Sequence, residues 1–418
     1  MQKRWIAVIL LMQMVAAYGG DGRIEISRID VASPPYVITN AGSYVFTENV
    51  QVLVSNTNGI MVLADNVSID LNGFTFSGPV PASDFGVGIY QDGAFNGLRV
   101  HNGVLSHWGS DEDERVIGGI YAPGKNNVME DLGVRDCAGG VTVGQGGRIV
   151  NSSFLDITMR NAITAGDGAV ISGCVSTGKS RTSGCIDGGV GATISDCAVS
   201  HSDDDAITAG AGSTVARCVV LDCEDGISVL SGSLIIDCAS REMGGTGFYA
   251  GENCRVENCT SVGSRWAGIE VRSNCVVTAC NVADNGHASA SESYLGGIVM
   301  DSNGTLTDCL VSGSISNGIR VASNCTVRNN KCHENQGVGI LVVGSHNRID
   351  ANELSSNGVG IETRGTNNVI TRNSVRNSSL SGVPSGDYNF NGLPQFYGPI
   401  VSPAALITNQ NPWVNFDL

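Results

Sequence analysis

The chain has 418 residues, 56 of them glycine, and a formal net charge of −16 from 24 Lys and Arg against 40 Asp and Glu. This acidity argues against nucleic acid or an anionic membrane surface as a partner, because both require a basic face on the protein. An anionic polysaccharide would need a local cluster of Arg and Lys or a bridging metal ion.

The first segment, residues 1–18, is predicted to be a secretory signal peptide. Lys3 and Arg4 precede an apolar stretch that is too short to span a bilayer, and Ala16 and Ala17 provide small residues for cleavage. We therefore expect a mature chain that is secreted or held in the periplasm or cell envelope, without insertion into the membrane.

An apolar Gly-Ile-like unit then returns through residues 56–379. From residue 120 onward its anchor residues are 20 to 23 positions apart, except for one interval of 29. A period in this range is typical of a solenoid, in which each repeat buries its apolar face against its neighbours. The fourteen anchors are Ile60, Ile89, Ile120, Val141, Ile163, Ile186, Ile207, Ile227, Phe248, Ile269, Ile298, Ile319, Ile340 and Ile361.

Each repeat contains three short runs of alternating apolar residues separated by turn residues, as in 268–271, 275–278 and 281–283. No helical period persists, so the repeats predict an all-β fold, a single-stranded parallel β-helix of about 14 coils of about 21 residues. Open strand edges at both ends need covering. We expect residues 19–55 to form an N-terminal cap and residues 380–418 an irregular C-terminal cap.

Ten of the fourteen cysteines fall in two columns, at 11 or 6 residues after an anchor. The first column continues as Asn330, Asn352 and Asn373, so we predict inward-facing ladders of small residues at the turns. We favour free, buried thiols over disulfides, because stacked side chains are close enough to bond but point the wrong way. The columns are Cys174, Cys197, Cys218, Cys238, Cys259, Cys280 and Cys309, and Cys254, Cys275 and Cys325.

Three segments depart from the period, at residues 79–85, 107–116 and 287–294. The last two follow the third strand of a coil and precede the first strand of the next one. We expect them to project from one edge of the solenoid, where they would wall a binding groove.

The segment Asn66-Val67-Ser68-Ile69-Asp70-Leu71-Asn72-Gly73-Phe74 resembles the first-coil signature of the pectin-lyase-like superfamily. The repeats are similar to those of NosD-type and other exported bacterial repeat proteins. This resemblance implies a right-handed parallel β-helix of bacterial origin. It does not imply one activity, because the fold carries lyases, hydrolases, epimerases and adhesins.

An acidic cluster precedes the first strands of two successive coils. Asp205 and Asp225 each stand two residues before an anchor, so in-register stacking would bring them together. When two carboxylates lie so near each other, their repulsion either raises the pKa of one of them or is neutralised by a bound cation. We therefore predict a candidate Ca²⁺ site formed by Asp187, Asp205 and Asp225.

The stretch Ser202-Asp203-Asp204-Asp205-Ala206-Ile207 is similar to the paired-Asp motif of polygalacturonases. This resemblance would make Asp204 and Asp205 the acid and the water-activating carboxylate. The neighbouring coils depart from that family, however, with Gly184-Cys185-Ile186 before the pair and Asp225 where a histidine is expected.

Two other interpretations of this corner stay open. In a Ca²⁺-assisted lyase, Arg241 or Arg265 would abstract a proton, with Asp225 among the carboxylates that hold the cation. Alternatively, the Asp residues only hydrogen-bond the backbone of their own turns.

A further strip of outward positions follows the first strands. Tyr249 and Trp266 would stack on sugar rings, and Glu270 and Arg272 would bind their polar groups. The alternative is a solvated face whose ion pairs contribute little.

Two functions follow from these features. The first is an exported polysaccharide-binding or polysaccharide-processing protein with a lyase-like or hydrolase-like groove on the first-strand sheet. The alternative is a non-catalytic structural or adhesive repeat protein of the cell envelope or extracellular matrix. An acidic side chain that converges with Arg in a real concavity would favour the first.

Overall fold

The computed structural model describes residues 22–79, 86–109, 118–178, 185–286, 296–378, 386–401 and 411–417. The predicted signal peptide and the predicted insertion at 287–294 lie outside the described residues, as do 80–85 and 110–116 of the other two insertions. The chain divides into two compact units, residues 1–159 and 160–418. Among the described residues there is no helix, and so none that is long and apolar enough to cross a membrane.

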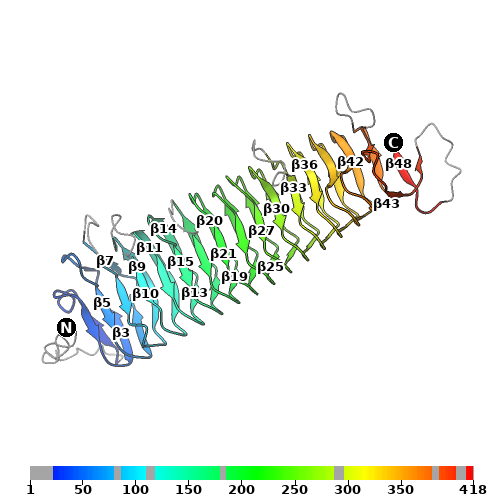
Figure 1. Ribbon diagram of the computed structural model, residues 1–418. Helices are drawn as coiled ribbons and strands as arrows, with labels where there is room; N and C mark the ends of the chain where they lie inside the picture. The colour runs from blue at the N-terminus through cyan, green and yellow to red at the C-terminus, as the bar shows by residue number, and fades with distance from the viewer. Residues whose placement is uncertain are drawn as a thin grey trace, which may run out of the picture. The chain divides into compact units, whose positions relative to one another are not determined.

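Each unit is a parallel β-solenoid in which the strands of successive coils lie side by side (Figure 1). One strand per coil forms what we call the first-strand sheet. In the first unit it contains β2 (Tyr36–Ile38), β5 (Ile60–Val62), β8 (Ile89–Gln91), β10 (Ile120–Ala122) and β12 (Val141–Val143). In the second unit it contains β15 (Ile163–Ala165), β18 (Ile186–Gly188), β21 (Ile207–Ala209), β24 (Ile227–Val229), β27 (Phe248–Ala250), β30 (Ala267–Val271), β33 (Gly296–Met300), β36 (Asn317–Val321), β39 (Val338–Val342), β42 (Val359–Thr363) and β45 (Tyr388–Asn389).

The other strands of each coil form a larger sheet. In the first unit these are β1 (Ile24–Ile26), β3 (Gly42–Phe46), β4 (Val50–Gln51), β6 (Val67–Asp70), β7 (Thr75–Ser77), β9 (Arg99–Ser106), β11 (Val128–Cys137), β13 (Arg148–Val150) and β14 (Ser153–Ile157). Strands β9 and β11 each span two such positions of a coil, because each pairs with two separate strands of a neighbouring coil.

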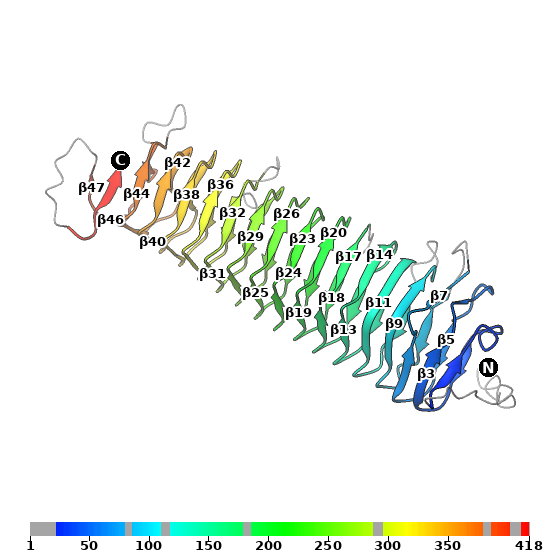
Figure 2. The same ribbon diagram turned by 180° about the vertical axis from the view of Figure 1, so that it is seen from behind.

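In the second unit the larger sheet takes two strands from each coil. The second strands are β16 (Val170–Ser172), β19 (Thr193–Ser195), β22 (Thr214–Ala216), β25 (Leu234–Ile236), β28 (Arg255–Glu257), β31 (Val276–Thr278), β34 (Thr305–Thr307), β37 (Thr326–Arg328), β40 (Arg348–Asp350), β43 (Val369–Thr371) and β46 (Phe396–Tyr397). The third strands are β17 (Val175–Thr177), β20 (Ala198–Ser200), β23 (Val219–Leu221), β26 (Ala239–Arg241), β29 (Thr260–Val262), β32 (Asn281–Ala283), β35 (Leu310–Ser312), β38 (Lys331–His333), β41 (Glu353–Ser355), β44 (Ser374–Arg376) and β48 (Asn415–Asp417), with β47 (Ile400–Val401) beside β48. Figure 2 shows β20, β23 and β26 side by side in chain order.

The predicted fold class, an all-β right-handed parallel β-helix, is confirmed. All fourteen predicted anchors lie in the first-strand sheet and are buried, because alternate residues of a strand point to opposite faces. Tyr36 pairs with Ile60, and Tyr388 pairs with Ile361. The segments expected as caps therefore each contribute a strand to this sheet.

The turn before each inward ladder position has a left-handed backbone. Asp237 precedes Cys238 with φ 55°, and Asn258 precedes Cys259 with φ 52°. Asn and Asp tolerate this conformation better than other residues with a side chain, which explains their frequency at the turns. The turn places the following small residue inside the coil.

The cysteines and asparagines form buried ladders, as predicted. All fourteen cysteines are buried thiols that form no disulfide. The Cys280 amide donates to Sγ of Cys309 (3.4 Å), and the Cys309 amide donates to Oδ1 of Asn330 (3.0 Å). Cys and Asn are interchangeable here because both offer an acceptor to the amide of the preceding coil. Burial raises the pKa of the Cys137 thiol to about 12, which keeps it protonated and unreactive.

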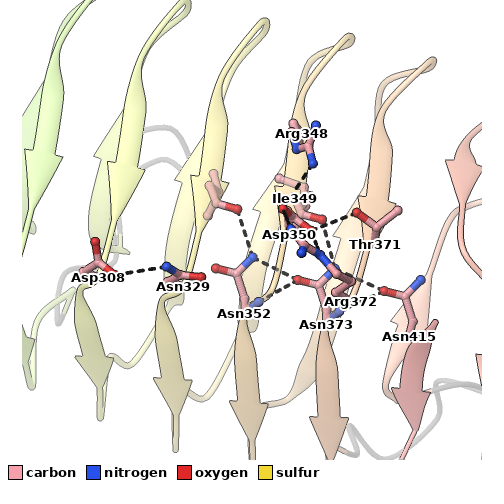
Figure 3. Close-up of polar contacts among 11 residues, drawn as sticks. Asp308, Asn329, Arg348, Ile349, Asp350, Asn352, Thr371, Arg372, Asn373 and Asn415 are labelled. Atoms are coloured by element: carbon pink, nitrogen blue, oxygen red, sulfur yellow. Dashed lines mark hydrogen bonds and ion pairs between the residues drawn. The ribbon is translucent and has the colours of Figure 1, made fainter. Parts of the chain in front are cut away.

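The asparagine ladder continues into the C-terminal segment. The amide N–H of Asn352 donates to Oδ1 of Asn373 (2.9 Å), and that of Asn373 donates to Oδ1 of Asn415 (3.0 Å), so the three side chains lie in line (Figure 3). The Asn352 side chain also donates to the Val327 carbonyl (3.0 Å). The row satisfies buried backbone groups that a corner would otherwise leave without partners.

Beside this ladder lies Asp350, which is fully buried. Burial alone would raise its pKa, but hydrogen bonds from Arg372, Thr371 and Arg348 lower it below its ordinary value (Figure 3). The Arg372 guanidinium also lies 5.7 Å from the ring centroid of Trp413. The C-terminal segment is thus joined to the last coils by both a hydrogen-bonded ladder and a cation–π contact.

We expect Ala279→Gly to stabilise the protein. Ala279 is exposed and has φ 55°, a conformation that costs a residue with a Cβ roughly 1 kcal/mol. The free energy of unfolding should rise by up to about 1 kcal/mol in denaturant melts. The matched control, Ala198→Gly within β20, should lower it by about 0.5–1 kcal/mol. Equal effects of both variants would contradict this account of the turn.

Replacing Asn352 tests the ladder. Asn352→Leu removes the acceptor of the Asn330 amide and the side-chain donor to the Val327 carbonyl, and should cost about 2–5 kcal/mol of unfolding free energy. Asn352→Cys keeps an acceptor for the Asn330 amide and should cost at least about 1 kcal/mol less. Thermal melts of the two variants measure the difference in their stability. If Asn352→Leu is more stable than Asn352→Cys, Cys and Asn are not interchangeable at this position.

Candidate functional site

The outer face of the first-strand sheet in the second unit carries a cleft of about 340 Å³ over strands β24, β27 and β30. Ionisable groups and aromatic rings from four successive coils meet in it. Its lining consists of Asp205, Asp225, Gly226, Ile227, Ser228, Thr246, Tyr249, Trp266, Glu270 and Arg272.

The floor of the cleft follows from strand alternation. The residue after each inward anchor points outward, and parallel pairing aligns Ser228 with Tyr249 and Tyr249 with Glu270. These three residues therefore lie in one row across β24, β27 and β30. The first-strand register decides which side chains share the cleft.

One wall comes from the turns that enter the strands. Asp205 and Asp225 stand at equivalent positions of successive coils, and the Ala206 amide donates to the Asp225 carbonyl (2.8 Å). The Thr246 amide donates to the Asp225 carboxylate. A side chain at Gly245 would overlap Oδ1 of Asp225, so glycine leaves the space that this carboxylate occupies.

The two carboxyl groups are held in an environment that resists ionisation. Burial, followed by repulsion from Asp225, Asp204 and Glu224, raises the pKa of Asp205 to about 6. Burial also raises the pKa of Asp225, although the hydrogen bond from Thr246 opposes this shift by favouring the charged form. The charge of Asp225 therefore makes ionisation of Asp205 less favourable.

The other wall is built around Arg272. Its Nε donates to the Tyr249 hydroxyl (3.0 Å), and its guanidinium lies 3.5 Å from Glu270 and 3.4 Å from Asp301. The hydrogen bond to Tyr249 raises the pKa of Arg272 above its ordinary value, so it stays a cation. Glu270 is only 7% exposed, and burial raises its pKa although Arg272 acts in the opposite direction.

Trp266 completes the cleft and is 41% exposed, which is unusual for a side chain of its size. Tyr249 is half-buried and also contacts Arg272 through its ring, 5.4 Å from the guanidinium carbon. Exposed aromatic faces beside carboxylates are the surfaces on which sugar rings bind, because the C–H faces of a sugar pack on the ring.

The structure thus brings six of the predicted site residues into one cleft, namely Asp205, Asp225, Tyr249, Trp266, Glu270 and Arg272. Ser228 and Thr246 also line the cleft and were not predicted from the sequence. Ser228 follows the anchor Ile227 directly, so the outward position after each anchor was a usable signal. Thr246 contributes to the site through its backbone amide, for which the sequence has no signal.

The other predicted residues lie elsewhere. Asp204 accepts the Asp205 amide (2.9 Å), which is the turn role that we considered as an alternative. Arg265 is exposed in a second hollow of about 670 Å³, with Asp203 and Glu224. Arg241 ends β26 on the larger sheet and is exposed there.

Asp187 lies one coil before Thr208 and accepts a hydrogen bond from its hydroxyl (3.1 Å), outside the lining of the cleft. Burial raises the pKa of Asp187. In the part of the chain that the structure describes, no group of three or more Asp, Glu, His or Cys side chains is placed to hold a metal ion. Asp187, Asp205 and Asp225 are therefore not gathered into one ligand set.

Comparison with known families places residues 139–322 and 225–380 within the family described as "Right handed beta helix region". No curated protein sequence matches the chain.

Solved structures with a similar fold include three polysaccharide-active enzymes. A mannuronic acid-specific polysaccharide family 6 lyase from human gut microbiota is 11% identical, with a TM-score of 0.45 over 90% of this chain and 91% of the lyase. The mannuronan C-5 epimerase AlgE6 A-module of Azotobacter vinelandii is 13% identical, with a TM-score of 0.33 over 86% of this chain and 90% of the module. The catalytic domain of a GH87 α-1,3-glucanase is 10% identical, with a TM-score of 0.38 over 88% of this chain and 63% of the glucanase chain. At these identities the likeness concerns the fold alone.

The raised pKa of Asp205 can be tested without a substrate. Asp225→Asn removes the largest repulsive charge and should lower the Asp205 pKa, because a neighbouring anion stabilises the protonated form. Glu224→Gln should lower it less. Asp237→Asn, an exposed carboxylate outside the cleft, is the control and should leave it unchanged. Carbon-13 NMR titration of the aspartate carboxyls, with Asp205→Asn to assign the signal, measures the shifts, and an ordinary Asp205 pKa in the unaltered protein would refute the electrostatic account.

Proposed function

Because the chain belongs to the right-handed β-helix family, whose match spans residues 139–380 of 418, we propose that the cleft over β24, β27 and β30 binds a polysaccharide and hydrolyses a glycosidic bond by acid–base catalysis. The observation that carries this proposal is the pair Asp205 and Asp225, two carboxyls with raised pKa that share a cleft with an exposed tryptophan. Perturbed carboxyls in a cleft are the usual mark of acid–base chemistry.

The environments of the two carboxyls suggest different roles. Asp205, with a pKa of about 6, holds a proton under mildly acidic conditions and would donate it to the glycosidic oxygen as the bond to C1 breaks. Asp225 accepts the Thr246 amide, which favours its charged form, and would either take a proton from the attacking water or attack C1 itself. Trp266 and Tyr249 would hold the sugar rings in place.

The lyase interpretation has less support. A lyase needs a base that can take a proton from the sugar, and Arg241 and Arg265 do not line the cleft. Arg272 does line it, but its raised pKa and its carboxylate neighbours keep it a guanidinium cation. The pairing of Glu270 with Arg272 inside a concavity supports a processing protein over a purely structural one.

Export and Ca²⁺ binding stay predictions. The signal for export lies in residues 1–18, outside the described residues. The use of Ca²⁺ can be examined in the same assays as catalysis, by comparing added Ca²⁺ with a chelator.

We expect Asp205→Asn and Asp225→Asn each to reduce hydrolysis by roughly 10²–10⁴-fold, because each removes one proton-transfer group. Release of reducing ends from a panel of polysaccharides, with and without Ca²⁺, measures this effect. Activity should also fall as pH rises through about 6, because Asp205 then loses the proton that it must donate.

Asp237→Asn is the control for the same assay, because it changes an exposed carboxylate outside the cleft. Full activity of both cleft variants would exclude these residues from catalysis. A protein that neither binds nor cleaves any polysaccharide would favour the non-catalytic repeat protein instead.

A further inference from the structure

We infer that the cleft accepts an uncharged polysaccharide chain and rejects chains of uronic acids. This inference rests on the proposed function, because it names the class of glycan that the same cleft would take.

The lining has an excess of negative charge. Asp205, Asp225 and Glu270 contribute three carboxyl groups against the single guanidinium of Arg272. Asp204 and Glu224 add negative potential, because both raise the pKa of Asp205. A uronate carries one further negative charge per sugar, so it would meet repulsion in a partly desolvated site where charges interact strongly.

The cation of the lining is already engaged. Arg272 lies 3.5 Å from Glu270 and 3.4 Å from Asp301, and it donates to Tyr249. A uronate that took Arg272 would leave Glu270, which is 7% exposed, with only the weaker attraction of Arg320 and without a paired counterion. A buried carboxylate without a partner is strongly unfavourable, so this exchange would not provide an anion site. Arg241 and Arg265 cannot substitute, since neither lines the cleft.

An uncharged chain fits the same surfaces without this conflict. Ionised carboxylates only accept hydrogen bonds, and the hydroxyls of a neutral sugar can donate hydrogen bonds to Asp225, and to Asp205 when it is ionised above about pH 6. Trp266, 41% exposed, and Tyr249 offer faces for the C–H groups of the rings. The charge pattern therefore selects hydroxyl donors over carboxylate groups.

Matched polymers that differ in charge test this inference with the full-length protein. Suitable pairs are highly methyl-esterified and de-esterified homogalacturonan, hydroxyethyl and carboxymethyl cellulose, and a mannan and polymannuronate. Affinity electrophoresis and isothermal titration at low ionic strength should show binding of the uncharged member of at least one pair. Its charged counterpart should bind at least ten-fold more weakly. High salt should reduce this difference in affinity, because it screens the repulsion between the polymer and the lining.

Two charge-removing variants locate the selectivity. Asp205→Asn should reduce the difference in affinity between the uncharged and the charged polymer, because it removes a carboxyl group from the lining. Glu270→Gln should also reduce this difference, because it releases Arg272 to bind an anionic sugar. Asp237→Asn should leave this difference in affinity unchanged. Because Glu270 is buried, circular dichroism must show that its variant folds. If it does not fold, the half-buried Asp205 provides the test.

The outcomes separate this inference from the proposed function. Equal or tighter binding of the uronate member would overturn the selectivity while leaving a polysaccharide cleft in place. Binding of amino-sugar polymers alone would also overturn it. If no polymer of any charge binds, the proposed function fails together with the inference that rests on it.

Discussion

The structure depends on one constraint, the in-register parallel pairing of successive coils. A strand of three residues cannot satisfy its own backbone, so each coil hydrogen-bonds to the coils before and after it. Pairing in register places each residue beside its equivalent in the next coil, as with Ile207 and Ile227. Every coil position thereby becomes a column, and each column must suit the environment that all of its members share.

The same constraint concentrates charge as well as apolar surface. Inside the coils, the Cys and Asn columns satisfy the backbone because each side chain offers an acceptor to its neighbour. Outside, stacking places Asp225 beside Asp205 and Glu270 beside Tyr249. Repulsion within a column is tolerated where a side chain stays protonated, as Asp205 does below pH 6, or where a cation such as Arg272 is nearby. The features on which the proposed catalysis rests are consequences of the repeat.

The columns explain which features could be predicted from the sequence. The anchors, the all-β fold and the Cys–Asn ladder were predictable, because each is a repeated local choice that the period displays directly. The juxtaposition of Asp205 with Asp225 required only the same offset from successive anchors. Arg241 and Arg265 were predicted as alternative bases for a lyase at this corner. Arg241 belongs to the third strand, however, and Arg265 faces the neighbouring hollow, so neither reaches the cleft.

The sequence by itself determined the period, the inward and outward columns and the acidic character of the corner, because these depend on residue type and spacing alone. Only the tertiary structure decided that Glu270 is buried beside Arg272, that the Thr246 amide holds Asp225, and that Trp266 stays exposed beside them. The physical reason is desolvation. A carboxyl pKa and the availability of a cation depend on which side chains of several coils exclude water together, and no spacing along one chain specifies that.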